Sequence, residues 1–189
     1  MKQDVSGAKH FHEALAAAQK DLRQQMEESF HIADEIDDAL DAKDYIKKHS
    51  LTPHPEGGWY RQVFGNDESG EKQISTIYYM LCDEDFSAFH RLHNMVEIWY
   101  YHAGEPLNIY VISPDGNLTV HHLSADGEMQ VVIEPEQWFA AELPGKKGFS
   151  LVGCAVAPAF TFGNFELAKK DGLLHDIPQH KALIEKLCR

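Results

Sequence analysis

The sequence contains no apolar run close to the about 20 residues that a transmembrane helix needs. Its first residues, MKQDVSGAKHFHEA, include no apolar segment of the kind that a secretory signal carries. Cysteine is scarce, with Cys82, Cys154 and Cys188 widely spaced and no CxxC pair among them. We therefore expect reduced thiols in a reducing compartment, in a cytoplasmic protein with no membrane partner.

Basic residues are also few, because 17 Lys and Arg stand against 30 Asp and Glu, for a formal net charge of −13. Nucleic acid binding needs basic surface to neutralise phosphates, so this balance argues against a nucleic acid partner. Hydrophobic residues make up 43% and charged residues 25% of the 189 positions, as in an ordinary globular protein. The length suits one domain with a short appendage.

The first part of the chain is expected to be helical. From residue 8 to about residue 40, apolar residues recur at steps of three and four positions, with no glycine or proline among them. Such a helix must bury its apolar stripe, either on the rest of the protein or on a second copy of itself. We predict an amphipathic helical extension over 1–40 and a main domain over 41–189, which opens with a short helix at about 42–48.

The pattern changes near residue 54, and β signals continue to about residue 158. Short segments rich in β-branched and aromatic residues alternate with turn sequences such as GNDESG, SPDG and PGKKG. Strands without long helices between them predict a mainly β fold, an antiparallel sandwich or barrel. The expected strands cover 58–64, 73–82, 96–103, 107–113, 118–123, 129–134, 137–143 and 149–157. Two short C-terminal helices are expected after them, at 165–170 and 179–187.

The stretch SAFHRLHNMVEIWYYHAG (87–104) holds His90, His93 and Glu97. Alternate residues of a strand share a face, so Glu97, Trp99 and Tyr101 are expected to point the same way. A carboxylate near two histidines suits either a metal site or an acid/base pair.

These residues resemble the first motif of the cupin superfamily, which ends as His93-x3-Glu97-x6-Gly104 does here, and PEQWFA (135–140) is similar to the second motif. The blocks HPEGGWYRQ, STIYYML, FHRL, EIWYYHAGEPL, WFAAEL and SLVGCAVAPAF, in this order, look like the uncharacterised fifth cupin family. The resemblance covers roughly residues 42–188. It implies a double-stranded β-helix, also called a jelly-roll barrel, and usually a homodimer.

The ligand pattern of metal-binding cupins is broken in this chain. Such cupins supply two His and one Glu from the first motif and one His from the second. His90 and His93 are three positions apart, so a regular strand points only one of them with Glu97, and Ala140 stands in the fourth ligand's place. We therefore expect no metal cofactor. The alternative is a divalent metal such as Fe, Mn, Ni or Zn on His90, His93 and Glu97, which needs a bulge to re-aim one residue.

Without a metal, the same residues resemble the site of metal-free cupin epimerases that act on keto sugars. His90 would then be the base, Glu97 its orienting partner or a second acid/base group, and Tyr101 or Tyr78 the acid. The competing interpretation is that His90 and Glu97 are a polar pair that only shapes a binding pocket.

Other candidates concern ligand contact. Trp59 and Arg61 share a face, and Arg61 could clamp an anionic group or form an ion pair at a dimer interface. The remaining candidates are aromatic side chains that stack on a ligand or belong to the core, hydroxyl groups on one strand, and a second pocket carboxylate: Trp99, Trp138, Ser75, Thr76 and Glu142. Cys154 is expected to be buried and inert.

The sequence thus predicts a cupin that binds a small polar metabolite, sugar-like or carbonyl-bearing, and leaves three functions open. The first is a metal-independent isomerase or epimerase. The second is a non-catalytic small-molecule-binding protein, and the third is a metal-dependent lyase or oxygenase.

Overall fold

The computed structural model describes residues 19–25, 41–65 and 72–189. The chain separates into two units, Met1–Leu40 and Asp41–Arg189. In the first unit, residues 19–25 are helical and exposed. The rest of the helix predicted over 8–40 lies outside the described residues. Within the described ranges, no helix is long and apolar enough to span a membrane.

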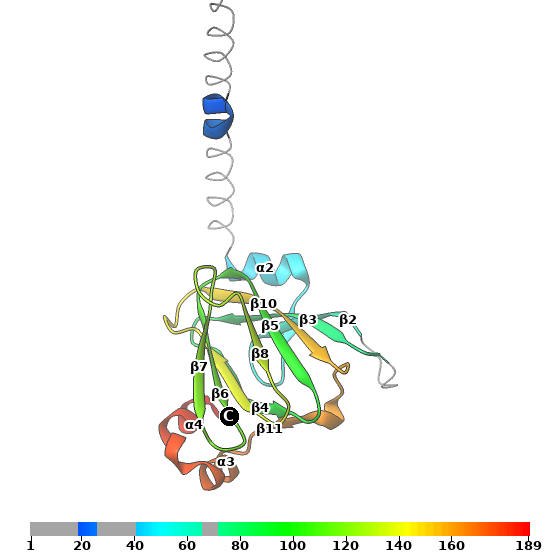
Figure 1. The fold of residues 1–189 in the computed structure, drawn as a ribbon, viewed down its shortest axis with the longest axis vertical. Helices are drawn as coiled ribbons and strands as arrows, with labels where there is room; N and C mark the ends of the chain where they lie inside the picture. Colours follow the sequence, from blue (N-terminus) through cyan, green and yellow to red (C-terminus); the bar gives the residue numbers. More distant parts are fainter. Residues whose placement is uncertain (1–18, 26–40, 66–71) are drawn as a thin grey trace, which may run out of the picture. The chain divides into compact units, whose positions relative to one another are not determined.

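The second unit is built from two antiparallel sheets that face each other (Figure 1). The six-stranded sheet has the order β1-β2-β3-β10-β5-β8, and the five-stranded sheet has the order β11-β4-β9-β6-β7. The strands are β1 (Thr52–Pro53), β2 (Trp59–Phe64), β3 (Ser75–Cys82), β4 (Phe86–Leu92), β5 (Val96–Gly104), β6 (Leu107–Ile112), β7 (Leu118–Leu123), β8 (Gln130–Ile133), β9 (Trp138–Glu142), β10 (Phe149–Ala157) and β11 (Phe165–Leu167). The predicted mainly β, jelly-roll fold is confirmed.

Short helices flank the barrel. α2 (Ala42–His49) begins at Asp41, whose Oδ1 accepts hydrogen bonds from the N–H groups of Lys43 (2.8 Å) and Asp44 (3.0 Å). It ends at Ser50, which takes the left-handed conformation with φ 52°. α3 (Lys170–Asp176) and α4 (Lys181–Leu187) follow the last strand and lie together at one end of the barrel (Figure 1).

Several segments differ from the sequence prediction, among them α3 (Lys170–Asp176), which was not expected. The helix expected over 165–170 is wrong, because residues 165–167 form β11 and pair with β4, with Leu167 opposite His90. Pairing satisfies backbone groups at an edge of β4, and this outweighs the local helical pattern. β4 itself is not among the predicted strands. Both of its faces are largely buried, so it lacks the alternation of apolar and polar residues that marks a half-exposed strand.

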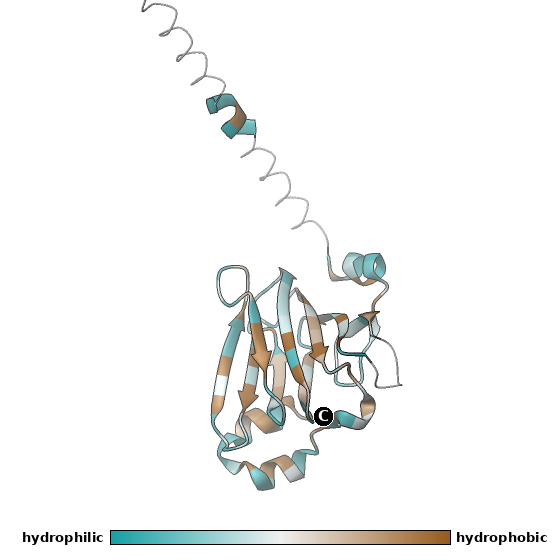
Figure 2. Cartoon of the chain, turned by 45° about the vertical axis from the view of Figure 1, so that its right-hand side comes forward, coloured by the Kyte–Doolittle hydropathy of each residue, from teal (hydrophilic) through white to brown (hydrophobic). Residues whose placement is uncertain are grey.

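The core lies between the two sheets. Its fully buried side chains come from both of them, and include Tyr79, Trp99, Ile109, Phe139 and Val152. A second apolar cluster fills the space between the five-stranded sheet and the C-terminal helices, and includes Phe89, Ile112, Ala140, Leu173, Ile184 and Leu187. Hydrophobic and hydrophilic residues alternate along the strands that enclose the core (Figure 2). One end of the space between the sheets is left open as a cavity.

Candidate functional site

A cavity of about 400 Å³ opens between the two sheets. One wall comes from β2, β3, β5 and β10 of the six-stranded sheet, and the other comes from β4. The loop before β2 and the loop between β10 and β11 complete it. Its polar lining residues are His54, Glu56, Tyr60, Gln62, Ser75, Tyr79, His90, Glu97, Trp99, Cys154 and Thr161. This size suits a small metabolite.

His90 lies on β4 and is 2% exposed. Its Nδ1 is 2.7 Å from the carbonyl oxygen of Ala88. A carbonyl oxygen can only accept, so Nδ1 carries the hydrogen and the neutral ring keeps its lone pair on Nε2. Phe139 packs against the ring, with the centroids 4.0 Å apart. The imidazole is therefore held in one orientation and one tautomer.

Glu56 is the carboxylate next to His90, with its Oε2 3.3 Å from His90 Nε2. This separation is longer than a charge-assisted hydrogen bond, so Nε2 is not committed to Glu56. Ser87 Oγ donates to Glu56 Oε1 at 2.8 Å, and the N–H of Ala88 donates to the Glu56 carbonyl at 2.9 Å. These bonds fix Glu56 against β4, where its charge can stabilise a protonated His90.

The turn that carries Glu56 depends on glycine. Gly57 has φ 116°, and a Cβ on it would lie 2.1 Å from the carbonyl oxygen of Phe86. Only glycine tolerates this backbone conformation and this close approach. Tyr79 Oη donates to the Gly57 carbonyl at 2.8 Å. Burial raises the pKa of Tyr79 well above its ordinary value, so its hydroxyl stays protonated and holds the turn.

His54 begins the same turn and shares the cavity. Its Nδ1 accepts a hydrogen bond from the N–H of Glu56 at 3.4 Å, so its neutral form carries the hydrogen on Nε2. Burial lowers the pKa of His54, and nearby His90 lowers it further, although Glu56 opposes both effects. His54 is therefore a neutral hydrogen-bond donor at neutral pH.

Glu97 enters the cavity from β5, on the sheet opposite His90, and is 7% exposed. Burial raises its pKa to about 8, and the negative charge of Glu56 adds to this rise. Contacts with Cys154 and Trp99 lower the pKa in part. At neutral pH the Glu97 carboxyl therefore carries a proton and can donate it.

Of the other predicted contact residues, Ser75 and Trp99 line the cavity with His90 and Glu97. Ser75 Oγ accepts from the N–H of Phe160 at 2.9 Å, which ties β3 to the loop after β10. Tyr101 is on the inner face of β5 but packs in the core beyond the cavity, and its Oη donates to the Gly104 carbonyl at 2.6 Å.

The remaining predicted contacts point elsewhere. Strand alternation brings Tyr60 and Gln62 into the cavity, so Trp59 and Arg61 do not line it; likewise Ser75, Ile77 and Tyr79 line it while Thr76 and Tyr78 do not. The Arg61 guanidinium lies 5.4 Å from the ring of Tyr78.

Two candidates on β9 also lie outside the cavity. Arg91 stacks on Trp138, with 4.4 Å between the guanidinium and the ring centroid. Glu142 is buried and pairs with Lys146, Lys186 and the hydroxyl of Tyr110. Burial would raise the pKa of Glu142, but these hydrogen bonds outweigh it and lower the pKa.

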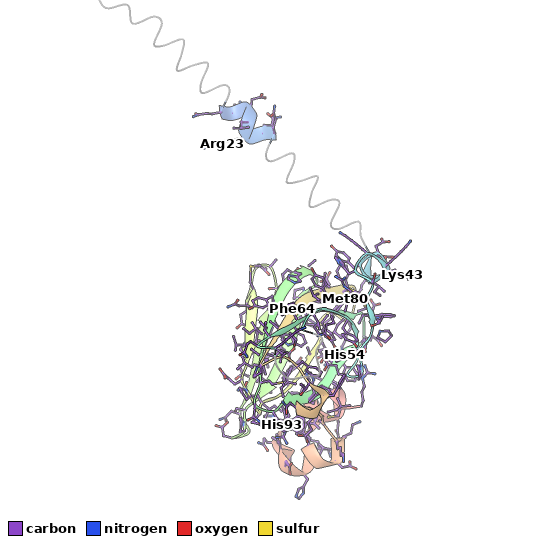
Figure 3. All side chains as sticks on the ribbon, turned by 90° about the vertical axis from the view of Figure 1, so that its right-hand side faces the viewer. Arg23, Lys43, His54, Phe64, Met80 and His93 are labelled. Atoms are coloured by element: carbon purple, nitrogen blue, oxygen red, sulfur yellow. The ribbon has the colours of Figure 1, made fainter. Side chains whose placement is uncertain are left out.

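His93 does not line the cavity. Its Nδ1 is 2.7 Å from Glu136 Oε2, and its Nε2 is 2.9 Å from Glu166 Oε2. His54 lines the cavity and His93 does not; both side chains are labelled in Figure 3. A site made of His90, His93 and Glu97 is therefore not assembled here.

The second cupin motif is placed differently from the sequence alignment. Ala140 packs under the C-terminal helices, and it is Phe139 that faces His90. Neither side chain can bind a metal ion. In the described part of the chain, no group of three or more His, Cys, Asp or Glu side chains is arranged to hold one. The residues present do not fit the metal centre of metal-binding cupins.

Among the lining residues that sequence reasoning missed are His54, Glu56, Tyr60 and Gln62. The block HPEGGWYRQ contains all of them, and its paired glycines mark a tight turn. Alternation along β2 offers two faces, and only the packed structure decides that Tyr60 and Gln62 face inward.

Comparisons with known proteins agree with this architecture. The family described as "Cupin superfamily (DUF985)" matches residues 43–168. A solved structure from Shewanella oneidensis is 42% identical over 79% of this chain and 98% of its own, with a TM-score of 0.74. A hypothetical protein from Leishmania major is 30% identical over 79% of this chain and 99% of its own, with a TM-score of 0.70.

A more distant likeness concerns the fold alone. The capsular polysaccharide assembling protein CapF from Staphylococcus aureus is 11% identical over 63% of this chain and 34% of its own, with a TM-score of 0.52. No curated protein matches the chain. The jelly-roll barrel with its cavity between the sheets defines a cupin. The chain belongs to the Cupin superfamily (DUF985) family, which confirms the resemblance drawn from the motifs.

Proposed function

We propose that the cavity binds a small, uncharged, carbonyl-bearing metabolite and transfers a proton on it, as a metal-independent isomerase or epimerase does. One observation carries this proposal: His90, held in a single tautomer, and Glu97, protonated at neutral pH, line the same cavity from opposite sheets. Groups whose surroundings give them different protonation states are suited to act as base and acid.

In the proposed step, His90 Nε2 takes the proton from the carbon beside the carbonyl group. The electron pair of the broken C–H bond forms a C=C bond, and the carbonyl oxygen takes the proton of Glu97. The product is an enol, an imidazolium at His90 and a carboxylate at Glu97. The Glu56 carboxylate, 3.3 Å from His90 Nε2, stabilises the imidazolium. The imidazolium then returns a proton to carbon while the enol O–H gives its proton back to Glu97, which re-forms the carbonyl group, restores the enzyme and completes exchange or isomerisation.

The charges of the cavity favour an uncharged ligand. Its ionisable carboxyl groups are Glu56 and Glu97, and no lysine or arginine occurs among the described lining residues. A phosphate or carboxylate would have to be desolvated next to Glu56 without a counter-charge, which is costly. Tyr60 and the aromatic residues Phe160 and Phe165 give the cavity faces on which a sugar-like ring can pack.

The experiment follows deuterium incorporation from D₂O by NMR. The substrates are a panel of uncharged ketoses and hydroxyketones, each with a phosphorylated counterpart. We expect the wild type to exchange at least one uncharged compound, and His90→Gln to lose about 100-fold or more in rate. The matched control is His121→Gln, because His121 pairs with Glu128 on the surface and does not line the cavity; it should exchange at the wild-type rate.

Equal exchange by the wild type and His90→Gln would contradict the proposed role of His90. A compound that binds tightly and is never exchanged would instead favour the non-catalytic binding protein.

A further inference from the structure

We propose that Phe160, Phe162 and Phe165 form an aromatic mouth, a surface at the edge of the cavity that holds an apolar ring of the ligand. The ligand is then an uncharged hydroxyketone that carries an aryl or bulky alkyl group on a short linker from its carbonyl carbon. This inference rests on the proposed function for the place of the carbonyl end, and it narrows the class of substrate. Binding of the ring can be measured without turnover.

The first observation is an exposed ring that belongs to the cavity. Phe162 is 66% exposed and lines the cavity. A single exposed apolar side chain is common on protein surfaces and by itself indicates nothing. Phe162 differs because its ring contacts those of Phe160 and Phe165 edge to face, with centroids 5.2 Å and 6.5 Å away. Phe160 and Phe165 line the cavity too. The three rings therefore form one apolar surface that leads from the cavity to solvent.

The second observation is that this surface begins at the proposed base. The ring centroids of His90 and Phe165 are 5.5 Å apart, and the next ring outward from Phe165 is Phe162. A ligand whose carbonyl end lies at His90 can therefore place a ring against Phe162 through a short linker. Aromatic rings at such separations attract each other beyond the effect of burial alone. The position of the reacting end thus fixes where the other end of the ligand lies.

The third observation is that the backbone of the aromatic mouth is held in place. The N–H of Phe160 donates to Ser75 Oγ at 2.9 Å, which ties the start of the loop between β10 and β11 to β3. The N–H of His93 donates to the Asn164 carbonyl at 2.9 Å, which ties the end of the same loop to the turn after β4. Phe165 begins β11, which is paired with β4. A surface that is already positioned loses little entropy when a ligand binds.

The chemistry of the aromatic mouth selects the kind of ring. An apolar ring that covers Phe162 removes apolar surface from water on both partners, whereas a small sugar leaves that surface exposed. A nucleotide also offers a ring, but its phosphates would lie beside Glu56 without a counter-charge, since no lysine or arginine occurs among the described lining residues. The aromatic mouth therefore favours an uncharged ligand with an aryl or alkyl group.

The test compares two hydroxyketones, 1-hydroxy-4-phenylbutan-2-one and 1-hydroxybutan-2-one, which is the same molecule without the ring. NMR titration of the protein gives their dissociation constants. We expect the wild type to bind the phenyl compound about tenfold more tightly or better, and Phe162→Ala to lose most of this preference while it binds 1-hydroxybutan-2-one as the wild type does. The matched control is Met129→Ala, because Met129 is also an exposed apolar residue (57%) but does not line the cavity; it should keep the preference. A wild type that does not bind the phenyl compound more tightly, or an unchanged preference in Phe162→Ala, overturns the inference.

A second measurement separates this inference from the proposed function. Deuterium exchange at the carbon between the carbonyl and hydroxyl groups reports proton transfer, and His90→Gln should lose this exchange while it keeps the preference for the phenyl compound. If the wild type exchanges both compounds but binds them equally, the aromatic mouth is wrong and the proposed function stands. If it prefers the phenyl compound through Phe162 and exchanges neither compound, the aromatic mouth stands and the proposed function is wrong.

Discussion

His90 Nε2 and Glu56 Oε2 lie 3.3 Å apart, although one residue is on a strand of the five-stranded sheet and the other is in the loop before β2. On β4, Ser87 Oγ donates to the Glu56 carboxylate and the Ala88 N–H donates to the Glu56 backbone carbonyl, and both bonds hold Glu56 in this place. The charge of Glu56 affects a third residue as well, because it raises the pKa of Glu97 across the cavity. Glu56 therefore interacts with both His90 and Glu97, and removing its charge should change the titration of Glu97.

Replacing Glu56 tests this coupling. Glu56→Gln keeps an oxygen that accepts from Ser87 but removes the negative charge. Because Glu56 raises the pKa of Glu97, we expect that pKa to fall below about 8 in the variant. A ¹³C NMR titration of the Glu97 carboxyl measures it. Glu136→Gln, which removes a carboxylate outside the cavity, serves as the control and should leave the titration unchanged. An unaltered titration in Glu56→Gln would show that the two carboxyl groups do not interact.

The raised pKa of Glu97 also predicts how stability depends on pH. Its pKa is about 8 in the folded protein against the ordinary 4.5, so the folded state binds this proton more tightly than the unfolded state does. The contribution of the protonated Glu97 to the free energy of unfolding is therefore fully present below pH 4.5 and is lost as the pH rises to about 8. Relative to the wild type, Glu97→Gln should gain up to about 1.4 kcal/mol of stability per pH unit across this range.

Thermal unfolding of the two proteins over a pH series measures this effect. Glu136→Gln offers a control of opposite sign. A hydrogen bond from His93 lowers the pKa of Glu136, so its contribution is present above the ordinary pKa and is lost as the pH falls. A difference between Glu97→Gln and the wild type that does not change with pH would mean that Glu97 titrates normally.

His93 distinguishes the metal-dependent alternative. Its ring bridges Glu136 and Glu166, both partly exposed. Such a bridge contributes on the order of 1 kcal/mol. His93→Ala should therefore unfold at a slightly lower temperature, as measured by calorimetry, and should retain proton exchange. Complete loss of exchange in a folded His93→Ala protein would instead favour a metal site that includes this residue.

Glu142 should matter for stability and not for turnover. It is buried, and Lys146, Lys186 and Tyr110 all hydrogen-bond to it. Glu142→Gln should destabilise the protein by about 2 kcal/mol in urea unfolding, because charge-assisted hydrogen bonds are lost at a buried group. Lys181→Met breaks the exposed pair with Glu185 and should change stability by less than about 0.5 kcal/mol. Lost exchange in a folded Glu142→Gln protein would place this carboxylate in the site after all.

The expected homodimer remains a prediction. The six-stranded sheet exposes Tyr100 (36%) and Val132 (45%), apolar side chains of the kind that a second subunit covers. Light scattering should give about twice the chain mass of 21.4 kDa. A mass equal to one chain would refute the dimer.

Much of the fold could be read from local pattern. Short segments rich in β-branched and aromatic residues, bounded by glycine-rich and proline-rich turns, mark β2, β3 and β5 to β10. The pattern fails for β4, which has no β-branched residue, and for β11, whose pairing with β4 is a contact between distant parts of the chain. The ordered motif blocks identify the family, and they also contain His90 and Glu97.

By itself, the sequence determined most of the strands, the family and four of the polar side chains that line the cavity, His90, Glu97, Ser75 and Trp99. Only the tertiary structure decided which face of each strand points inward, because alternation divides the residues of a strand between two faces but does not show which face is buried. This is why Tyr60 takes the place expected for Arg61, and why Glu142 lies outside the cavity. The tertiary structure also decided which carboxylate lies next to His90. Glu56 reaches His90 because the turn at Gly57 packs against β4, and the spacing of the two residues in the sequence does not indicate this proximity.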